Sequence, residues 1–174
     1  LEAYAQALKL DPRRIDLLLS RGQLFYRRGD YASAAEDFES AYALDKKQFA
    51  VVMNLGRAYF QMKVYGNAYL NFEYGNGLAE DDSQKAEVLY WRGQSLDKLD
   101  EVTAALRDYQ ALLQMPAGAA EAEWLELAAE RSSVLFTPTR TPVTPTLTST
   151  PRPTNTPMTP TQTHTRQPTR TPTP

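Results

Sequence analysis

The sequence predicts an all-α protein, built as a helix-turn-helix solenoid and followed by a disordered Thr/Pro-rich tail. Residues 1–136 repeat at a period near 34 residues and are rich in Ala but poor in β-branched residues, which favours helices over strands. Residues 137–174 hold 16 Thr and 10 of the 12 Pro of the chain. One helix pair cannot bury its own apolar face, so successive pairs stack and share a core. The tail has too few apolar residues to offset the entropy of ordering.

Composition and charge exclude several classes of protein. The chain has no Cys and one His, His164 in the tail, so it cannot build disulfides, thiolate zinc sites, or His-based catalytic or metal sites. Residues 1–136 carry 15 Lys and Arg against 21 Asp and Glu, a balance that opposes nucleic-acid binding. No apolar run approaches the roughly 18 residues of a membrane span, so we expect no direct membrane insertion of this segment.

Three glycines mark the repeat. Gly22, Gly56 and Gly93 are separated by 34 and 37 residues, and each is followed at the same offsets by a large residue, an alanine and an aromatic residue. The small residues indicate where two helices approach closely, and the aromatic rings would fill the space beside them. The residues three, 12 and 16 positions after the glycines are Phe25, Tyr59 and Leu96, then Ala34, Ala68 and Ala105, then Phe38, Phe72 and Tyr109.

The helices follow from this register. Each unit breaks once, at Gly29-Asp30, Lys63-Val64 and Leu99-Asp100, which separates a first helix from a second. Asp11 before Pro12 predicts a capping residue and the first position of a helix, and Pro116 predicts that another helix ends before it. We predict helices at 1–9, 13–28, 31–44, 48–62, 65–78, 84–98, 101–114 and 119–135.

These helices divide the chain into a repeat domain, 1–136, and a linker, 137–174. Within the domain we expect the second half of a truncated repeat at 1–14, full repeats at 15–48, 49–82 and 86–118, and a C-terminal capping helix at 119–136. The last helix places four Glu beside Trp124, Leu125, Leu127 and Ala128, so it could cover the end of the stack. The alternative is a fourth unit that decays. The truncated first repeat leads us to expect further sequence before Leu1.

These residues resemble the tetratricopeptide repeat family over residues 1 to about 115. The resemblance rests on the period of 34, on the order hydrophobic–Gly–aromatic in the first helix and on the order Ala–aromatic–Ala in the second, where Gly75 and Leu112 replace the last Ala. Tyr4, Ala7 and Pro12 match the end of an earlier unit. The resemblance implies a right-handed superhelix that binds proteins. Two departures are Arg21 and Arg92, which replace the usual Leu before the glycine.

Three short motifs could suggest catalysis or ligand binding, but each is explained better as a structural feature. Gly75-Asn76-Gly77 lacks the third glycine of a dinucleotide loop and indicates a helix end. Glu80-Asp81-Asp82 could bind a cation, but a solvated turn explains it better. Gly93-Gln94-Ser95 lacks the second glycine of a nucleophile elbow. We therefore predict that the chain is not an enzyme and has no catalytic residue, cofactor or metal.

A peptide-binding groove is the candidate site. In stacked helix pairs the first helices line the inner, concave side, and the residues three before, one after and four after each glycine face it. Aromatic and Arg side chains anchor interfaces, and amide groups can bond a peptide backbone. The alternative is that these side chains only pack against the neighbouring first helices. The nine predicted groove residues are Leu19, Gln23, Tyr26, Met53, Arg57, Phe60, Tyr90, Gln94 and Asp97.

The resemblance also implies what the groove does not bind. One branch of the family grips the C-terminal carboxylate of a chaperone with Lys, Asn and Arg side chains. The corresponding positions here are Leu19, Gln23, Asn54, Glu87 and Trp91, of which only Asn54 matches. Because Glu87 would repel a carboxylate, we expect no binding of a chaperone tail.

The tail predicts a spacer. Its eight Thr-Pro dipeptides favour an extended, polyproline-like chain of about 100 Å when stretched. Its composition is similar to that of the Thr/Pro-rich linkers of bacterial cell-surface and secreted proteins, which favours an extracytoplasmic over a cytoplasmic location. The competing interpretations are a phosphorylated regulatory tail and a ligand for SH3-type domains.

Three functions remain open from the sequence. The first is a non-catalytic protein–protein interaction scaffold that binds a partner peptide or helix in the groove, with the tail as spacer or tether. The second is an accessory or regulatory region of a larger enzyme or sensor whose active domain lies outside this chain. The third is a structural spacer without a ligand. The sequence predicts neither the partner nor the oligomeric state.

Overall fold

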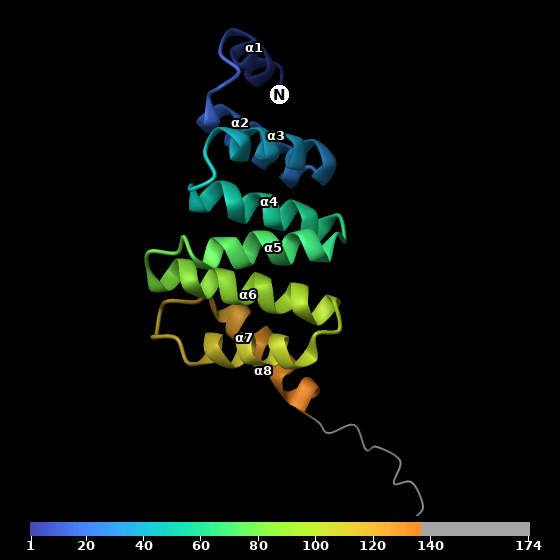
Figure 1. Ribbon diagram of the computed structural model, residues 1–174, viewed down its shortest axis with the longest axis vertical. Helices are drawn as coiled ribbons and strands as arrows, with labels where there is room; N and C mark the ends of the chain where they lie inside the picture. Colours follow the sequence, from blue (N-terminus) through green and yellow to red (C-terminus); the bar gives the residue numbers. More distant parts are fainter. Residues whose placement is uncertain (137–174) are drawn as a thin grey trace, which may run out of the picture. The chain divides into compact units, whose positions relative to one another are not determined.

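The computed structural model describes residues 1–136; the predicted linker, 137–174, lies outside the described residues. Residues 1–136 form eight α-helices and no strand, as the sequence predicts (Figure 1). Their ends differ from the predicted ends by at most three residues. The helices are α1 Glu2–Leu10, α2 Ile15–Arg27, α3 Tyr31–Leu44, α4 Phe49–Gln61, α5 Tyr65–Asn76, α6 Asp82–Lys98, α7 Val102–Leu113 and α8 Ala122–Phe136.

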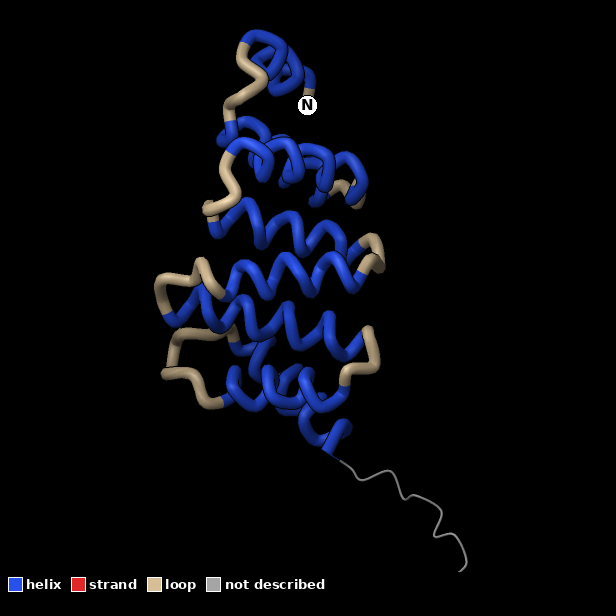
Figure 2. The backbone as a smooth tube through the Cα atoms, in the orientation of Figure 1, coloured by secondary structure: helices blue, strands red, loops and turns tan. Residues whose placement is uncertain are grey.

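The helices stack in the order of the chain (Figure 1, Figure 2). The closest neighbours are α2 with α3, α4 with α5, and α6 with α7, which are the three predicted pairs. Successive pairs meet through α3 and α4 and through α5 and α6, and α8 packs on α7 in the same way. The predicted helix-turn-helix solenoid is therefore confirmed for residues 1–136.

Each pair closes on a contact between a glycine and a buried aromatic ring. A Cβ atom added at Gly22 would lie 2.6 Å from Phe38 Cε1, and one added at Gly56 would lie 2.6 Å from Phe72 Cε1. The third contact is wider, with 3.0 Å between a Cβ at Gly93 and Tyr109 Cε1. The rings of Phe38, Phe72 and Tyr109 are almost completely buried. The predicted close approach is confirmed, because these separations leave no room for a side chain at the glycines.

The turn inside each pair contains one residue in the left-handed region, seven positions after the anchor glycine. Its φ is 80° at Gly29, 63° at Lys63 and 61° at Asp100. Glycine adopts this conformation freely, whereas Lys63 and Asp100 hold it at a cost of about 1 kcal/mol each. The positions of the three turns agree with the predicted breaks, and the common geometry keeps the second helices in the same register.

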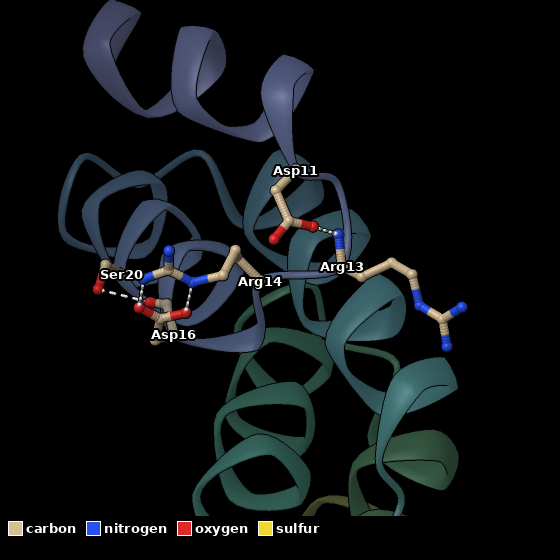
Figure 3. A network of polar contacts seen from close by, with 5 residues as sticks. All are labelled: Asp11, Arg13, Arg14, Asp16 and Ser20. Atoms are coloured by element: carbon tan, nitrogen blue, oxygen red, sulfur yellow. Dashed lines mark hydrogen bonds and ion pairs between the residues drawn. The ribbon is translucent and has the colours of Figure 1, made fainter.

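The start of α2 differs from the prediction (Figure 3). Asp11 does not cap the helix: its Oδ1 accepts the backbone N–H of Arg13 at 3.1 Å, and Pro12 and Arg13 form a turn. The helix begins at Ile15, after Arg14, whose guanidinium donates to the Asp16 carboxylate at 2.6 and 2.8 Å. Aspartate side chains stabilise turns as well as helix N-termini, so Asp11-Pro12 is compatible with both. The prediction that Asp11 caps the helix was therefore wrong.

The two arginines that depart from the family pattern pair with aspartates of the second helices. Arg21 in α2 donates to both oxygens of Asp37 in α3, at 2.6 and 2.8 Å. Arg92 in α6 does the same to Asp108 in α7, at 2.6 and 2.7 Å. Both aspartates follow their arginines by 16 residues and are buried. In the middle pair the same two positions hold Leu55 and Asn71, so an apolar and an amide side chain replace the ion pair.

We expect the substitution Gly22→Ala to lower the free energy of unfolding by about 1–3 kcal/mol, because the added methyl group overlaps the buried Phe38 ring. Gly66→Ala in α5 is the matched control. A Cβ there meets no atom within 4 Å, so removal of a helical glycine should stabilise the protein by about 0.5 kcal/mol. Urea denaturation measures both. Equal effects at the two glycines would refute the close contact.

A double-mutant cycle on Arg92 and Asp108 should show strong coupling. Asp108→Asn alone removes the negative charge of the main partner of a largely buried guanidinium and should cost about 3 kcal/mol, and Arg92→Leu is the other single variant. The double variant Arg92→Leu with Asp108→Asn copies the middle pair and should unfold within about 1 kcal/mol of the parent. Chemical denaturation of the four proteins gives the coupling energy. If the losses in the free energy of unfolding of the two single variants add up in the double variant, the Leu–Asn pair does not substitute for the ion pair.

Candidate functional site

The nine predicted groove residues lie on α2, α4 and α6, and we call them the first-helix surface. Positions three before, one after and four after a glycine fall on one side of a helix, because successive residues turn by about 100°. Met53, Arg57 and Phe60 show this on α4, where Leu55 and Tyr59 point to the opposite side. The surface therefore brings together side chains from three helices that are 34 or 37 residues apart in the sequence.

Burial divides the first-helix surface into two groups. Met53 and Tyr90 are 2% and 8% exposed, so for these two the packing alternative holds and they are not accessible to a partner. Each lies three residues before its glycine, where the neighbouring helix of the stack covers it: Met53 contacts Phe72 and Val88, and Tyr90 packs against α8. Gln23 is exposed, and the half-buried members are Leu19, Tyr26, Arg57, Phe60, Gln94 and Asp97.

Two aromatic residues occupy the same place in successive units. The Tyr26 ring meets Tyr31 edge to face at 5.2 Å between centroids, and the Phe60 ring meets Tyr65 at 5.4 Å. Phe60 also contacts Trp91 of α6, at 5.5 Å. The first residue of each second helix thus holds the ring in place. Burial raises the pKa of the Tyr26 hydroxyl, so that ring stays neutral at physiological pH.

An ion pair that the sequence did not predict joins α4 to α6. Arg57 donates to the carboxylate of Glu87, and its guanidinium lies 5.4 Å from the centre of the Trp91 ring. Burial raises the pKa of the Glu87 carboxyl, although Arg57 opposes the shift. Arg57 Nε is buried without a partner among residues 1–136. The Nε–H group of Arg57 therefore keeps an unused donor that is not exposed, and the charge of Arg57 is already balanced by Glu87.

The α8 end of the surface is closed by two contacts between residues 34 positions apart. Tyr90 and Trp124 stack at 5.0 Å with an angle of 16° between their rings. Asp97 accepts two hydrogen bonds from Arg131, both at 2.7 Å. α8 is therefore in register with the first helices of the earlier units. Asp97 was predicted as a groove residue without a partner, and the 34-residue offset to Arg131 was the signal that could have identified one.

A cleft of about 420 Å³ lies between α6, α7 and α8 and includes Gln94 and Asp97 of the first-helix surface. Tyr109, Leu127 and Arg131 also line it. Gln94 Nε2 and the Tyr109 hydroxyl are buried and have no hydrogen-bond partner among the described residues. Buried donors without partners are costly. Because neither atom is exposed to solvent, a partner that enters the cleft does not reach them in this arrangement.

Residues 1–136 contain neither a metal-binding cluster nor a helix that could span a membrane. No three acidic or histidine side chains in this range lie close enough together to hold a metal ion. None of its helices combines the length and the apolar character that crossing a membrane requires.

Part of the chain is similar to a known repeat family. The tetratricopeptide repeat family model matches residues 1–49 and 19–68. No curated protein sequence is significantly similar to the chain.

Solved structures share the fold. The first repeat domain of Spaghetti (RPAP3), bound to the HSP90 peptide SRMEEVD, is 20% identical, with a TM-score of 0.61 over 72% of this chain and 95% of that one. MamA is 23% identical, with a TM-score of 0.64 over 78% of this chain and 81% of that one. The Yersinia enterocolitica type III secretion chaperone SycD, in complex with a peptide of the translocator YopD, is 22% identical, with a TM-score of 0.58 over 69% and 88%.

The family match and the shared fold agree with the glycine–aromatic register described above. Residues 1–68 therefore match the tetratricopeptide repeat family model, and residues 1–136 share the fold of solved tetratricopeptide repeat domains.

Proposed function

We propose that the protein is a non-catalytic interaction scaffold that holds an extended or helical segment of a partner protein on the first-helix surface. The observation that carries the proposal is the placement of Tyr26 and Phe60, two partly exposed aromatic rings, at the same position of successive first helices, with the exposed side chain of Gln23 on the same surface. Carbonyl groups of a bound segment are acceptors of the right kind for the Gln23 amide. Tyr26 and Phe60 lie on the same surface and supply the apolar anchors.

The similar structures support this function for the fold. The Spaghetti domain is bound to an HSP90 peptide, a second RPAP3 domain to an HSP70 peptide, and SycD to a peptide of YopD. Because their identity to this chain is between 20% and 22%, they support peptide binding as a mode and do not name the partner.

We further propose that the partner segment is not an acidic C-terminus. Leu19 and Gln23 cannot supply the positive charge that a terminal carboxylate needs, and Glu87 adds a negative one. The cation of the same region, Arg57, is already paired with Glu87. A neutral or mildly polar segment matches this balance better.

For the tail, whose residues lie outside the described range, composition supports a spacer or tether. Ten Pro, 16 Thr and no acidic residue favour an extended chain, and we propose an extracytoplasmic, cell-surface location for it.

The proposal can be tested by panning a phage-displayed library of random 12-residue peptides on the full chain. We expect the selected peptides to bind the parent protein in calorimetry. Their affinity for the variant Tyr26→Ala with Phe60→Ala should be at least about tenfold lower, because the substitutions remove two apolar anchors. The peptide SRMEEVD should not bind. Tyr90 is unsuitable for this test because it is buried against Trp124.

The matched control is Val102→Ala with Leu113→Ala, two exposed residues of α7 outside the first-helix surface. Circular dichroism establishes that both variants remain helical. A library that yields no binding peptide, or peptides that bind the Tyr26/Phe60 variant as tightly as the parent, would reject the first-helix surface as the binding site. Micromolar binding of SRMEEVD would reject the proposed charge preference.

A further inference from the structure

Three equivalent clefts lie between successive helices of the series α1, α3, α5 and α7. The cleft between α1 and α3 contains Arg21, and the cleft between α5 and α7 contains Arg92 with Asp108. Their volumes are about 360 and 250 Å³. In both, the guanidinium is held by two hydrogen bonds to an aspartate, so a charged group already fills the base of the cleft.

The cleft between α3 and α5 is different, because Leu55 and Asn71 replace the arginine and the aspartate. Its volume is about 370 Å³, and we call it the tyrosine cleft after Tyr42, Tyr59 and Tyr74, which line it with Leu55, Leu70 and Glu39. Leu70 and Tyr74 are 62% and 41% exposed, whereas Leu55 at the base is buried. Exposed large apolar side chains that gather in a hollow mark an interaction site.

The tyrosine cleft is separate from the first-helix surface. On α4, Leu55 and Tyr59 point away from Arg57 and Phe60, given about 100° of rotation per residue. The cleft has its own polar arrangement. The Tyr59 hydroxyl donates to Glu39, and burial followed by this carboxylate raises the pKa of Tyr59 to about 12. The hydroxyl therefore remains a donor, and the Glu39 carboxylate is held at the rim.

Charge and size together define the occupant. The exposed Glu39 is the charged residue of the lining, and no Lys or Arg of residues 1–136 forms an ion pair with it. Lys46 Nζ lies 5.8 Å from the centre of the Tyr42 ring, so one ring of the cleft already has a cation near its face. A volume of about 370 Å³ admits a few residues of extended chain but not an α-helix about 10 Å across.

We propose that the tyrosine cleft binds a proline-rich extended segment that carries a basic side chain. Proline rings pack on tyrosine faces, and a polyproline helix is already ordered, so a shallow cleft suffices to hold it. Proline lacks an N–H group, so the segment needs few hydrogen bonds from a mainly apolar lining. The basic side chain pairs with Glu39. This binding is additional to that of the first-helix surface and does not depend on it.

The test uses the full chain, and in parallel residues 1–139, so that the Pro- and Arg-containing tail cannot compete, with a fluorescein-labelled 12-residue peptide of Ala-Pro-Pro triplets in which one Ala is replaced by Arg. Fluorescence anisotropy measures its dissociation constant, and NMR of the same sample locates the bound peptide. We expect saturable binding with shifts at Tyr42, Leu70 and Tyr74. A peptide with every Pro replaced by Ala, and one with the Arg replaced by Glu, should each bind at least about tenfold more weakly.

The sharpest variant is Leu55→Arg with Asn71→Asp, which copies the ion pair of the two neighbouring clefts into the base of this one. It should fold as stably as the parent and lose at least about tenfold in affinity, because the guanidinium occupies the apolar base. Leu70→Ala with Tyr74→Ala should lose a similar factor, and Glu39→Gln should remove the preference for the Arg peptide. Tyr26→Ala with Phe60→Ala should bind the peptide as the parent does.

Several results would overturn the proposal. They are the absence of binding at millimolar peptide, equal binding of the Pro-free peptide, and unchanged binding to both cleft variants. Shifts confined to Tyr26 and Phe60 would place the peptide on the first-helix surface instead. If one cleft variant unfolds, the other decides, since they change different residues.

Discussion

The contact between a glycine of each first helix and an aromatic ring of the following second helix is the constraint on which the structure depends. With no side chain at Gly22 or Gly56, the ring sits against the helix backbone, and any Cβ atom there would overlap it. This fixes how the two helices of a pair approach. Because the contact recurs in all three pairs, it aligns the faces of α2, α4 and α6 and those of α3, α5 and α7. Surfaces on both sides of the stack follow from it.

Polar pairs then give the repeated scaffold different chemistry at different places. Arg–Asp pairs cross the outer two helix pairs, whereas Leu55 and Asn71 leave the middle one apolar at its base. On the other side, the ion pair between Arg57 and Glu87 joins α4 to α6. A second ion pair, between Asp97 and Arg131, joins α6 to α8. Long side chains at such positions order their neighbours as well as balancing charge. One backbone arrangement thus supports two surfaces of distinct character.

Much of the fold could be predicted because the information is local and repeated. The spacing of the glycines, the breaks at Gly29, Lys63 and Asp100 and the helical composition locate every helix to within a few residues. The error at Asp11 and Pro12 arose because aspartate before a proline is compatible with a turn as well as with a helix cap. Arg21 and Arg92 were visible as departures from the family pattern, but their aspartates could not be identified as partners before the helices were paired.

The sequence by itself determined the class of fold, the register of the units and the set of residues on one side of the first helices, since these depend on periodicity and on the size of side chains at fixed offsets. The tertiary structure decided which of those residues are accessible. Met53 and Tyr90 are buried by neighbouring helices, and Asp97 is paired across 34 residues. Such contacts depend on how one unit rotates onto the next, and a periodic pattern carries no information on that rotation.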